Sequence, residues 1–172
     1  MTSDRETWSK LIFDKLVDAG VSLFAYVPDF GNAAIVDMAS EHNSTRAVLL
    51  SSEQEGVALC AGADLVGARG VLLMQSSGVG NCPNMLSLIS GGRFPMLMIV
   101  TMRGDYGEQN PWQYPMGQAV VPVLEAMGMQ CIRVEREDEL EQAIDAALSA
   151  AFRAEQGVAL VLTQKFLGAK AF

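Results

Sequence analysis

Hydrophobic positions follow two alternating patterns along this chain. Short, nearly continuous apolar runs, typical of buried strands, alternate with longer segments in which apolar residues recur at helical spacing. The runs predict six strands, over residues 21–27, 46–50, 71–75, 94–101, 129–134 and 158–163. The spacing predicts a first helix that ends at Gly20, and further helices over residues 32–41, 53–66, 81–90, 118–127 and 137–154. This alternation predicts one α/β domain over residues 1–172, a doubly wound, mostly parallel six-stranded sheet with helices on both faces.

Doubly wound sheets bind their ligands at the carboxyl ends of the strands. Three unusual loops follow predicted strands: "PDFGN" at residues 28–32, "SSGVGN" at 76–81, and a long non-repetitive loop at 102–117. Glu53 comes shortly after the second predicted strand and therefore shares their edge. The pattern places the expected functional site at this edge.

Two carboxylates, Glu53 and Glu55, stand at the start of the apolar helix predicted over residues 53–66. Acidic residues complement the exposed N–H groups of a helix N-terminus, so a structural role is one explanation for both. Residues two apart point to different faces of a helix, and at most one of these side chains points into the site. The other is then a solvated acid of the first turn.

Candidate residues in the first two loops also have structural explanations. Asp29 follows a predicted strand, where it can cap the next helix. Gly78 and Gly80 allow a backbone to approach a ligand closely, but they suit a plain tight turn equally well. A dinucleotide-binding fingerprint fits poorly, because Pro83 stands where its third glycine belongs.

The long loop contains a cation and two aromatic residues. Arg103 is suited to binding an anion, and it can instead pair with Asp105 or Glu108. Trp112 and Tyr114, flanked by prolines, suit either a lid over the site or a subunit contact.

Composition excludes several classes of function. A net charge of −8 argues against nucleic acid as a partner. No apolar run approaches the ~18 residues of a membrane span, so the hydrophobic half of the composition favours a subunit interface instead. Cys60, Cys82 and Cys131 lack metal-site spacing and suggest buried free thiols in a reducing compartment, and the only histidine is His42. Without a targeting pattern at the N-terminus, we expect a cytoplasmic protein with no metal ligands of its own.

The segment "SSEQEGVALCAGADLVGARGVLLMQSSGVGN", residues 51–81, resembles the pyrimidine-binding domain of thiamine-diphosphate enzymes. In that domain a glutamate at a helix start precedes a small-residue helix, a strand and an SSGxGN-type turn. Within the superfamily, "VPD", "LLMQSSGVGN", "RGDYGEQNP" and "PMGQAV" are similar, in this order, to the separate alpha subunit of sulfopyruvate and phosphonopyruvate decarboxylases. The resemblance covers the whole chain.

The resemblance implies non-oxidative decarboxylation of a 2-oxo acid to an aldehyde and carbon dioxide. Glu53 corresponds to the family's catalytic glutamate, because its distance to Gly62 matches the family spacing; it activates the aminopyrimidine ring of thiamine diphosphate by a hydrogen bond to N1′. Glu55 is then its helix-capping neighbour. Asp29 corresponds to a second catalytic acid, which relays a proton at the reacting carbon and contacts substrate.

Further site residues are implied by the same resemblance. The cofactor and substrate side is expected to be lined by Gln75, Ser76, Ser77, Gly78 and Asn81. Asn81 is also expected to contact substrate, and Arg103 to bind a substrate's anionic tail. The chain departs from the pattern at Ser52, where many relatives have a histidine, and it lacks the histidine pair that simple pyruvate decarboxylases carry after the fourth strand.

No GDG motif occurs in the chain, so the resemblance implies that the ligands of the diphosphate and of Mg²⁺ lie elsewhere. We therefore expect a beta subunit carrying a GDG…N domain, an assembly of α2β2 or larger, and activity only in that complex. Two alternatives remain from the residues themselves. One is a nucleotide- or flavin-binding α/β module, and the other is a catalytically silent homologue that scaffolds a partner.

Overall fold

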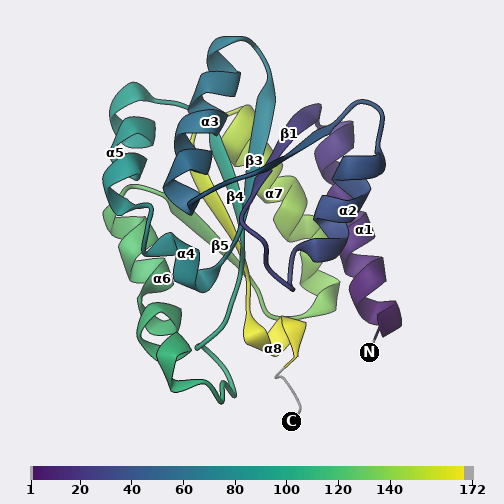
Figure 1. The fold of residues 1–172 in the computed structure, drawn as a ribbon, viewed down its shortest axis with the longest axis vertical. Coiled ribbons are helices and arrows are strands. Elements are labelled where there is room, and N and C mark those ends of the chain that lie inside the picture. Colours follow the sequence, from purple (N-terminus) through teal and green to yellow (C-terminus); the bar gives the residue numbers. More distant parts are fainter. Residues whose placement is uncertain (1, 169–172) are drawn as a thin grey trace.

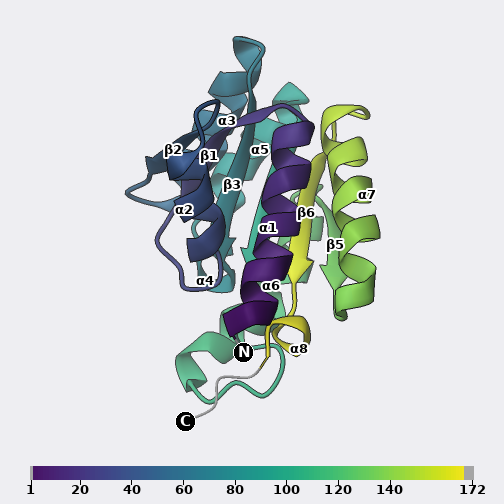
Figure 2. The ribbon, with the colours of Figure 1, turned by 90° about the vertical axis from the view of Figure 1, so that its right-hand side faces the viewer.

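A six-stranded sheet forms the centre of the protein (Figures 1 and 2). The computed structural model describes residues 2–168, with side chains from residue 7 onward. The strands are β1 (Val21–Tyr26), β2 (Arg46–Leu49), β3 (Arg69–Gln75), β4 (Met96–Thr101), β5 (Gln130–Val134) and β6 (Gly157–Leu162). Their order is β2-β1-β3-β4-β6-β5, and every neighbouring pair is parallel. The predicted fold class is confirmed.

Helices cover both faces of this sheet. They are α1 (Thr2–Asp18), α2 (Ala33–Glu41), α3 (Glu53–Leu65), α4 (Ser76–Val79), α5 (Pro83–Gly92), α6 (Tyr114–Ala126), α7 (Leu140–Phe152) and α8 (Gln164–Leu167), with 3₁₀ turns η1 (Pro111–Gln113) and η2 (Glu137–Glu139). Helices α1, α2 and α7 pack on one face, and α3, α5 and α6 pack on the other (Figure 2). None of the helices within residues 2–168 combines the length and apolar character that a membrane span requires.

The central strands explain why both faces are covered. Along β3, Val71 and Leu73 join the core under α1, α2 and α7, whereas Leu72 and Met74 join the core under α3, α5 and α6. Side chains alternate between the two faces of a strand, so a continuous apolar run is buried only where helices lie on both sides. All six residues of β4 are buried in the same way.

Several predicted boundaries are wrong. The "SSGVGN" segment, predicted as a turn, begins with the short helix α4, and α5 starts at Pro83, a residue type favoured in the first turn. Helix α6 starts at Tyr114 inside the predicted loop, and α8 has no counterpart in the prediction. Cys60 and Cys82 are buried free thiols as predicted, but Cys131 is only half-buried because β5 is an edge strand.

The chain changes direction across the sheet between β1 and β3. From β1 it continues to β2 on one side, and from β3 it continues to β4 on the other. The region outside the carboxyl ends of β1 and β3 is therefore the topological switch point, where doubly wound sheets bind ligands. The loops that follow β1 and β3 are the "PDFGN" and "SSGVGN" segments.

Candidate active site

Glu53 is the first residue of α3, and its side chain is buried at the site edge. The residue is 8% exposed, and its Oε2 atom accepts a hydrogen bond of 2.8 Å from the side-chain amide of Asn81, which follows α4. Oε1 has no hydrogen-bond partner among the described residues. A buried carboxylate is stabilised by donors, so Oε1 is the atom available to a donor from a ligand.

Glu55 lies on the exposed side of the same helix. Its Oε2 atom accepts hydrogen bonds of 2.8 Å from the backbone N–H and from the hydroxyl of Ser51. These bonds lower the pKa of Glu55, the backbone bond most strongly. One acid is thus buried and the other caps the start of α3, as expected.

Gly78 makes room for the Glu53 carboxylate. A Cβ atom on residue 78 would lie 2.5 Å from Cγ and Cδ of Glu53, and closer still to Oε1. Real Cβ contacts are essentially never this short, and Gly78 itself is buried in α4. The glycine of the "SSGVGN" segment therefore serves a close approach between side chain and backbone, where the sequence left open whether it serves only a turn.

Asp29, after β1, accepts hydrogen bonds through both carboxylate oxygens. Oδ2 accepts from the Thr101 hydroxyl at 2.5 Å and from the backbone N–H groups of Gly31 at 3.0 Å and Asn32 at 3.3 Å. Oδ1 accepts from the Gln75 amide at 3.2 Å. Asp29 therefore caps the turn that leads into α2, and its less crowded Oδ1 retains room for another donor.

Gln75 and the serines of α4 connect this acid to its surroundings. The Ser77 hydroxyl donates to Gln75 Oε1 at 3.1 Å. Ser76 is fully buried and exchanges two hydrogen bonds of 3.1 Å with the backbone of Arg103. Ser76 thereby fastens the start of α4 to the segment after β4.

Asn32 belongs to the site, although the sequence analysis assigned it no role. It is 1% exposed, and its side-chain amide donates to the carbonyl of Met74 at 3.2 Å and to Thr101 at 3.4 Å. Its Oδ1 atom is buried without a hydrogen-bond partner. In the sequence, an asparagine after a glycine resembles an ordinary turn residue, and only the neighbouring strand ends reveal this role.

Arg103 forms a two-pronged ion pair with Glu108. Its Nε donates to Oε2 at 2.5 Å and its Nη2 donates to Oε1 at 2.7 Å. The guanidinium lowers the pKa of the Glu108 carboxyl far below its ordinary value, against the opposing effect of burial. Of the two pairing partners that the sequence left open, Glu108 is the one observed. The hydrogen bond to Glu108 raises the pKa of Arg103, and the charge of Asp29 adds a smaller increase. Nη1 of Arg103 has no hydrogen-bond partner among the described residues.

Large aromatic side chains are exposed on the loops of this edge. Trp112 is 88% exposed, Phe30 71% and Tyr106 57%. Tyr114 is 43% exposed and donates its hydroxyl to the carbonyl of Glu108 at 2.5 Å. The predicted alternatives for Trp112 and Tyr114, a lid or a subunit contact, both agree with this exposure.

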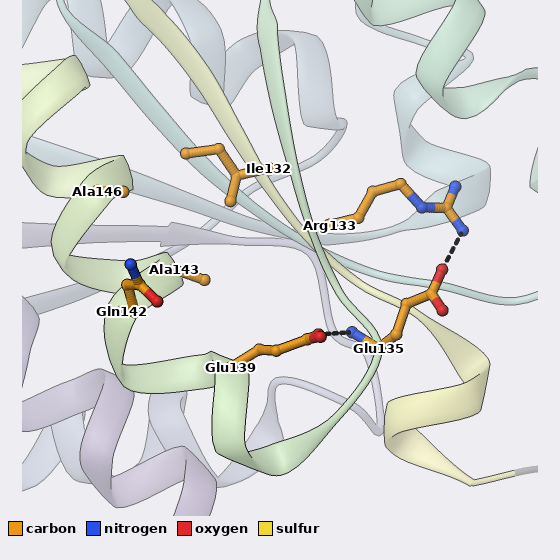
Figure 3. Close-up of a pocket in the computed structure, with 7 residues that line it drawn as sticks. All are labelled: Ile132, Arg133, Glu135, Glu139, Gln142, Ala143 and Ala146. Carbon is orange, nitrogen blue, oxygen red and sulfur yellow. Dashed lines mark hydrogen bonds and ion pairs between the residues drawn. The ribbon is translucent and has the colours of Figure 1, made fainter.

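A separate hollow of about 440 Å³ lies beside the outermost strand β5, between it and α7 (Figure 3). Its lining residues are Ile132, Arg133, Glu135, Glu139, Gln142, Ala143 and Ala146, none of which was expected in the site. Arg133 pairs with Glu135 at 3.6 Å, and Glu139 accepts from the Glu135 backbone at 3.1 Å. Within residues 2–168, no group of three or more acidic, histidine or cysteine side chains is arranged to hold a metal ion.

The sequence of the chain is similar to those of known proteins. The family described as "Thiamine pyrophosphate enzyme, N-terminal TPP binding domain" matches residues 6–121. The chain is 30% identical over 155 residues to "Sulfopyruvate decarboxylase subunit alpha" of Methanococcus maripaludis, covering 90% of this chain and 93% of that protein. It is 31% identical over 152 residues to "Phosphonopyruvate decarboxylase" of Streptomyces viridochromogenes, covering 87% of this chain and 38% of that protein.

A solved structure shares the fold. The 2-oxoglutarate:ferredoxin oxidoreductase from Magnetococcus marinus superposes with a TM-score of 0.73 at 14% sequence identity. The match covers 92% of this chain and 29% of that chain.

Proposed function

Because the chain belongs to the family of thiamine pyrophosphate enzyme N-terminal TPP binding domains, we propose that it is the alpha subunit of a thiamine-diphosphate-dependent 2-oxo acid decarboxylase. The substrate class is a 2-oxo acid with an acidic tail, as in sulfopyruvate or phosphonopyruvate, and the products are an aldehyde and carbon dioxide. One observation carries the proposal: the buried Glu53 carboxylate has one oxygen bound by Asn81 and the other available, in a space that a Cβ at Gly78 would fill.

These residues fit the aminopyrimidine end of the cofactor. When bound, thiamine diphosphate supplies the carbanion-stabilising chemistry of decarboxylation. Glu53 Oε1 would accept a hydrogen bond from the aminopyrimidine ring, and burial would strengthen that bond. Asn81 holds the carboxylate in orientation, and the buried Gly78 lets the two groups approach. Gln75, Ser76 and Ser77 complete the cofactor side, Ser76 by fastening the start of α4.

The substrate side of the site is formed by Asp29, Arg103 and Asn81. Asp29 Oδ1 has a single weak donor, Gln75, so it is the oxygen that exchanges a proton near the reacting carbon. Arg103 is fixed by Glu108 through Nε and Nη2, which leaves Nη1 to the acidic tail of the substrate.

The remaining half of the active site lies on a partner subunit. Relatives matched over most of their length are named subunit alpha, which supports a beta subunit whose GDG…N domain supplies the ligands of Mg²⁺ and the diphosphate, in an assembly of α2β2 or larger. The exposed Phe30, Tyr106 and Trp112 at the site edge support a partner there, because aromatic residues are enriched in protein interfaces. Free cysteines support a cytoplasmic location.

The experiment that tests this proposal begins with purification of the chain from its native cells and identification of the protein that copurifies. The complex is then assayed with sulfopyruvate, thiamine diphosphate and Mg²⁺. Glu53→Gln removes the carboxylate and is expected to lower the rate by about 10²- to 10⁴-fold while the complex still assembles. Glu55→Gln is the matched control on the exposed side of α3 and keeps the rate.

Three results would contradict the proposal. Full activity of the Glu53→Gln variant would show that the Glu53 carboxylate takes no part in the reaction. A complex that assembles but never turns over is a catalytically silent scaffold. Retention of a nucleotide or flavin by the chain alone identifies a binding module of the same fold.

A further inference from the structure

The segment between β4 and η1 carries Arg103 but contains no helix or strand. Gly104 and Gly107 adopt positive φ angles of 82° and 60°, so the backbone turns sharply twice within it. A loop of this kind has no ladder of backbone hydrogen bonds to hold it. The position of Arg103 therefore depends on side chains that reach the loop from elsewhere.

Gln164 is such a side chain. It is the first residue of α8, two positions after the end of β6, and it is 3% exposed. Its Oε1 atom accepts from the backbone N–H groups of Asp105 and Tyr106, both at 3.1 Å, and its own N–H donates to Asp105 Oδ1 at 3.1 Å. Because β4 and β6 are neighbours, their carboxyl ends bring α8 beside the loop (Figure 2).

The amide nitrogen of Gln164 also reaches the ion pair. Nε2 donates at 2.8 Å to Glu108 Oε2, the same oxygen that accepts from Arg103 Nε. The other oxygen, Oε1, accepts from Arg103 Nη2 and from the backbone N–H groups of Gln109 and Asn110. The Glu108 carboxylate is thus fixed in its plane, and its two bonds to the guanidinium fix the direction of Arg103 in turn.

We infer that Gln164 is a positioning residue that aims Arg103 at the acidic tail of the substrate and so determines specificity for 2-oxo acids with such a tail. The inference rests on the proposed function, in which Arg103 binds that tail. Glutamine suits the position because one side chain presents an acceptor to two N–H groups and a donor to a carboxylate. Methionine of similar length makes none of these bonds. Glutamate keeps the acceptor but replaces the donor by a charge that repels Glu108.

The test uses the whole complex with its partner and cofactor. For Gln164→Met, we expect the KM for sulfopyruvate to rise about 10- to 100-fold and kcat to change by less than about twofold. The rise in KM follows because a hydrogen bond to a charged group contributes more free energy than one between neutral groups. For pyruvate, whose tail is an uncharged methyl group, the KM stays unchanged. In the isolated chain, the backbone amide hydrogens of Asp105 and Tyr106 exchange with solvent faster in the Gln164→Met variant than in the unmodified protein, because both lose their acceptor. Lys165→Met, one residue away and exposed, is the matched control.

Gln164→Glu provides a second variant for the case in which the methionine variant folds poorly. It keeps the protection of the two amide hydrogens but raises the KM for sulfopyruvate at neutral pH. The KM recovers as the pH falls, because a protonated carboxyl again donates to Glu108. A purely structural role predicts no such pH profile.

Equal effects on both substrates, or the same effects from Lys165→Met, overturn the inference. An Arg103→Met variant made in parallel distinguishes failure of the inference from failure of the proposed function. If it loses the preference for sulfopyruvate while both Gln164 variants keep it, the inference is wrong and the proposed function stands. If the unmodified complex decarboxylates neither substrate, the proposed function fails, and the inference fails with it.

Discussion

Gly78 and Glu53 come from different helices and approach so closely that residue 78 has no space for a side chain. A Cβ atom there would lie 2.5 Å from two carbons of the Glu53 side chain. We predict that Gly78→Ala displaces the carboxylate from its bond with Asn81. Overpacking of this kind costs about 1–3 kcal/mol of unfolding free energy. Decarboxylation by the complex should fall as strongly as in Glu53→Gln, measured beside urea unfolding of the isolated chain.

Gly62→Ala is the control for this substitution. Gly62 lies in the same helix as Glu53, and beyond the backbone of that helix nothing lies within 4 Å of the place that a Cβ atom would take. Alanine in an open helical position stabilises by about 0.5–1 kcal/mol relative to glycine, and activity should be unchanged. If both alanine variants behave alike, the close approach of Gly78 to Glu53 has no functional consequence.

Asp29 is expected to be a structural as well as a chemical residue. Removing its carboxylate in Asp29→Ala leaves the backbone N–H of the buried Asn32 without its acceptor and leaves the Thr101 hydroxyl only its longer bond to the Met74 carbonyl, at 3.3 Å. An unsatisfied buried donor of this kind costs about 1–3 kcal/mol. Asp37→Ala, at an exposed position of α2, should change the unfolding free energy by less than about 0.5 kcal/mol. Urea unfolding of both variants measures the difference. Equal stability of the two would show that the hydrogen bonds of Asp29 contribute nothing net.

The sheet could be predicted from sequence because its signal is local. Continuous apolar runs such as β4 identify buried parallel strands, and the alternation with helices fixes the class of fold. Helical geometry likewise predicted that at most one of Glu53 and Glu55 points into the site, whereas the choice of Glu53 came from the family resemblance. These predictions needed no knowledge of which distant residues meet.

The contacts that build the site were beyond the sequence because they join distant segments. Asn81 meets Glu53 across 28 positions, and Gln164 meets Glu108 across 56. Neither Asn32 nor Gln164 differs in local pattern from an ordinary turn or helix-start residue. Helix α4 was missed for a related reason: four residues are too few to show a helical period.

Low pH should lower the free energy of unfolding because Glu108 becomes protonated. Arg103 holds the folded-state pKa of Glu108 well below its ordinary value of 4.5, so the unfolded state binds a proton at a higher pH than the folded state does. The stabilisation by this pair is therefore complete above pH 4.5 and is lost progressively as the pH falls below it. We predict that Glu108→Gln is less stable than the unmodified chain at pH 7 and that this difference shrinks towards pH 3.

Urea unfolding at a series of pH values between 7 and 3 measures that difference. Glu41→Gln, an exposed substitution at the end of α2, is the control and should follow the unmodified chain throughout. A stability difference for Glu108→Gln that is independent of pH would contradict the assignment of acid sensitivity to this ion pair.

The cysteines report on how closed the site region is in solution. Burial raises the pKa of Cys60 and of Cys82 to about 12, and the charge of Glu53 adds to the shift at Cys82. At pH 8 only about one such thiol in 10,000 is ionised, and the thiolate is the reactive form. Cys131 is half-buried, with a pKa of about 11. In the native chain we therefore expect alkylation at Cys131 first, with Cys60 and Cys82 modified only after unfolding in denaturant.

Mass spectrometry of the alkylated native chain gives the order of modification, and Cys131→Ser is the control that should leave almost no reaction. Cys82 carries the more informative result, because its thiol donates to the Gly78 carbonyl at 3.5 Å, directly behind the Glu53 carboxylate. Rapid alkylation of Cys82 in the folded chain would mean that α4 opens readily. Glu53 would then be solvated in the free subunit, and its dry environment would have to form only in the complex.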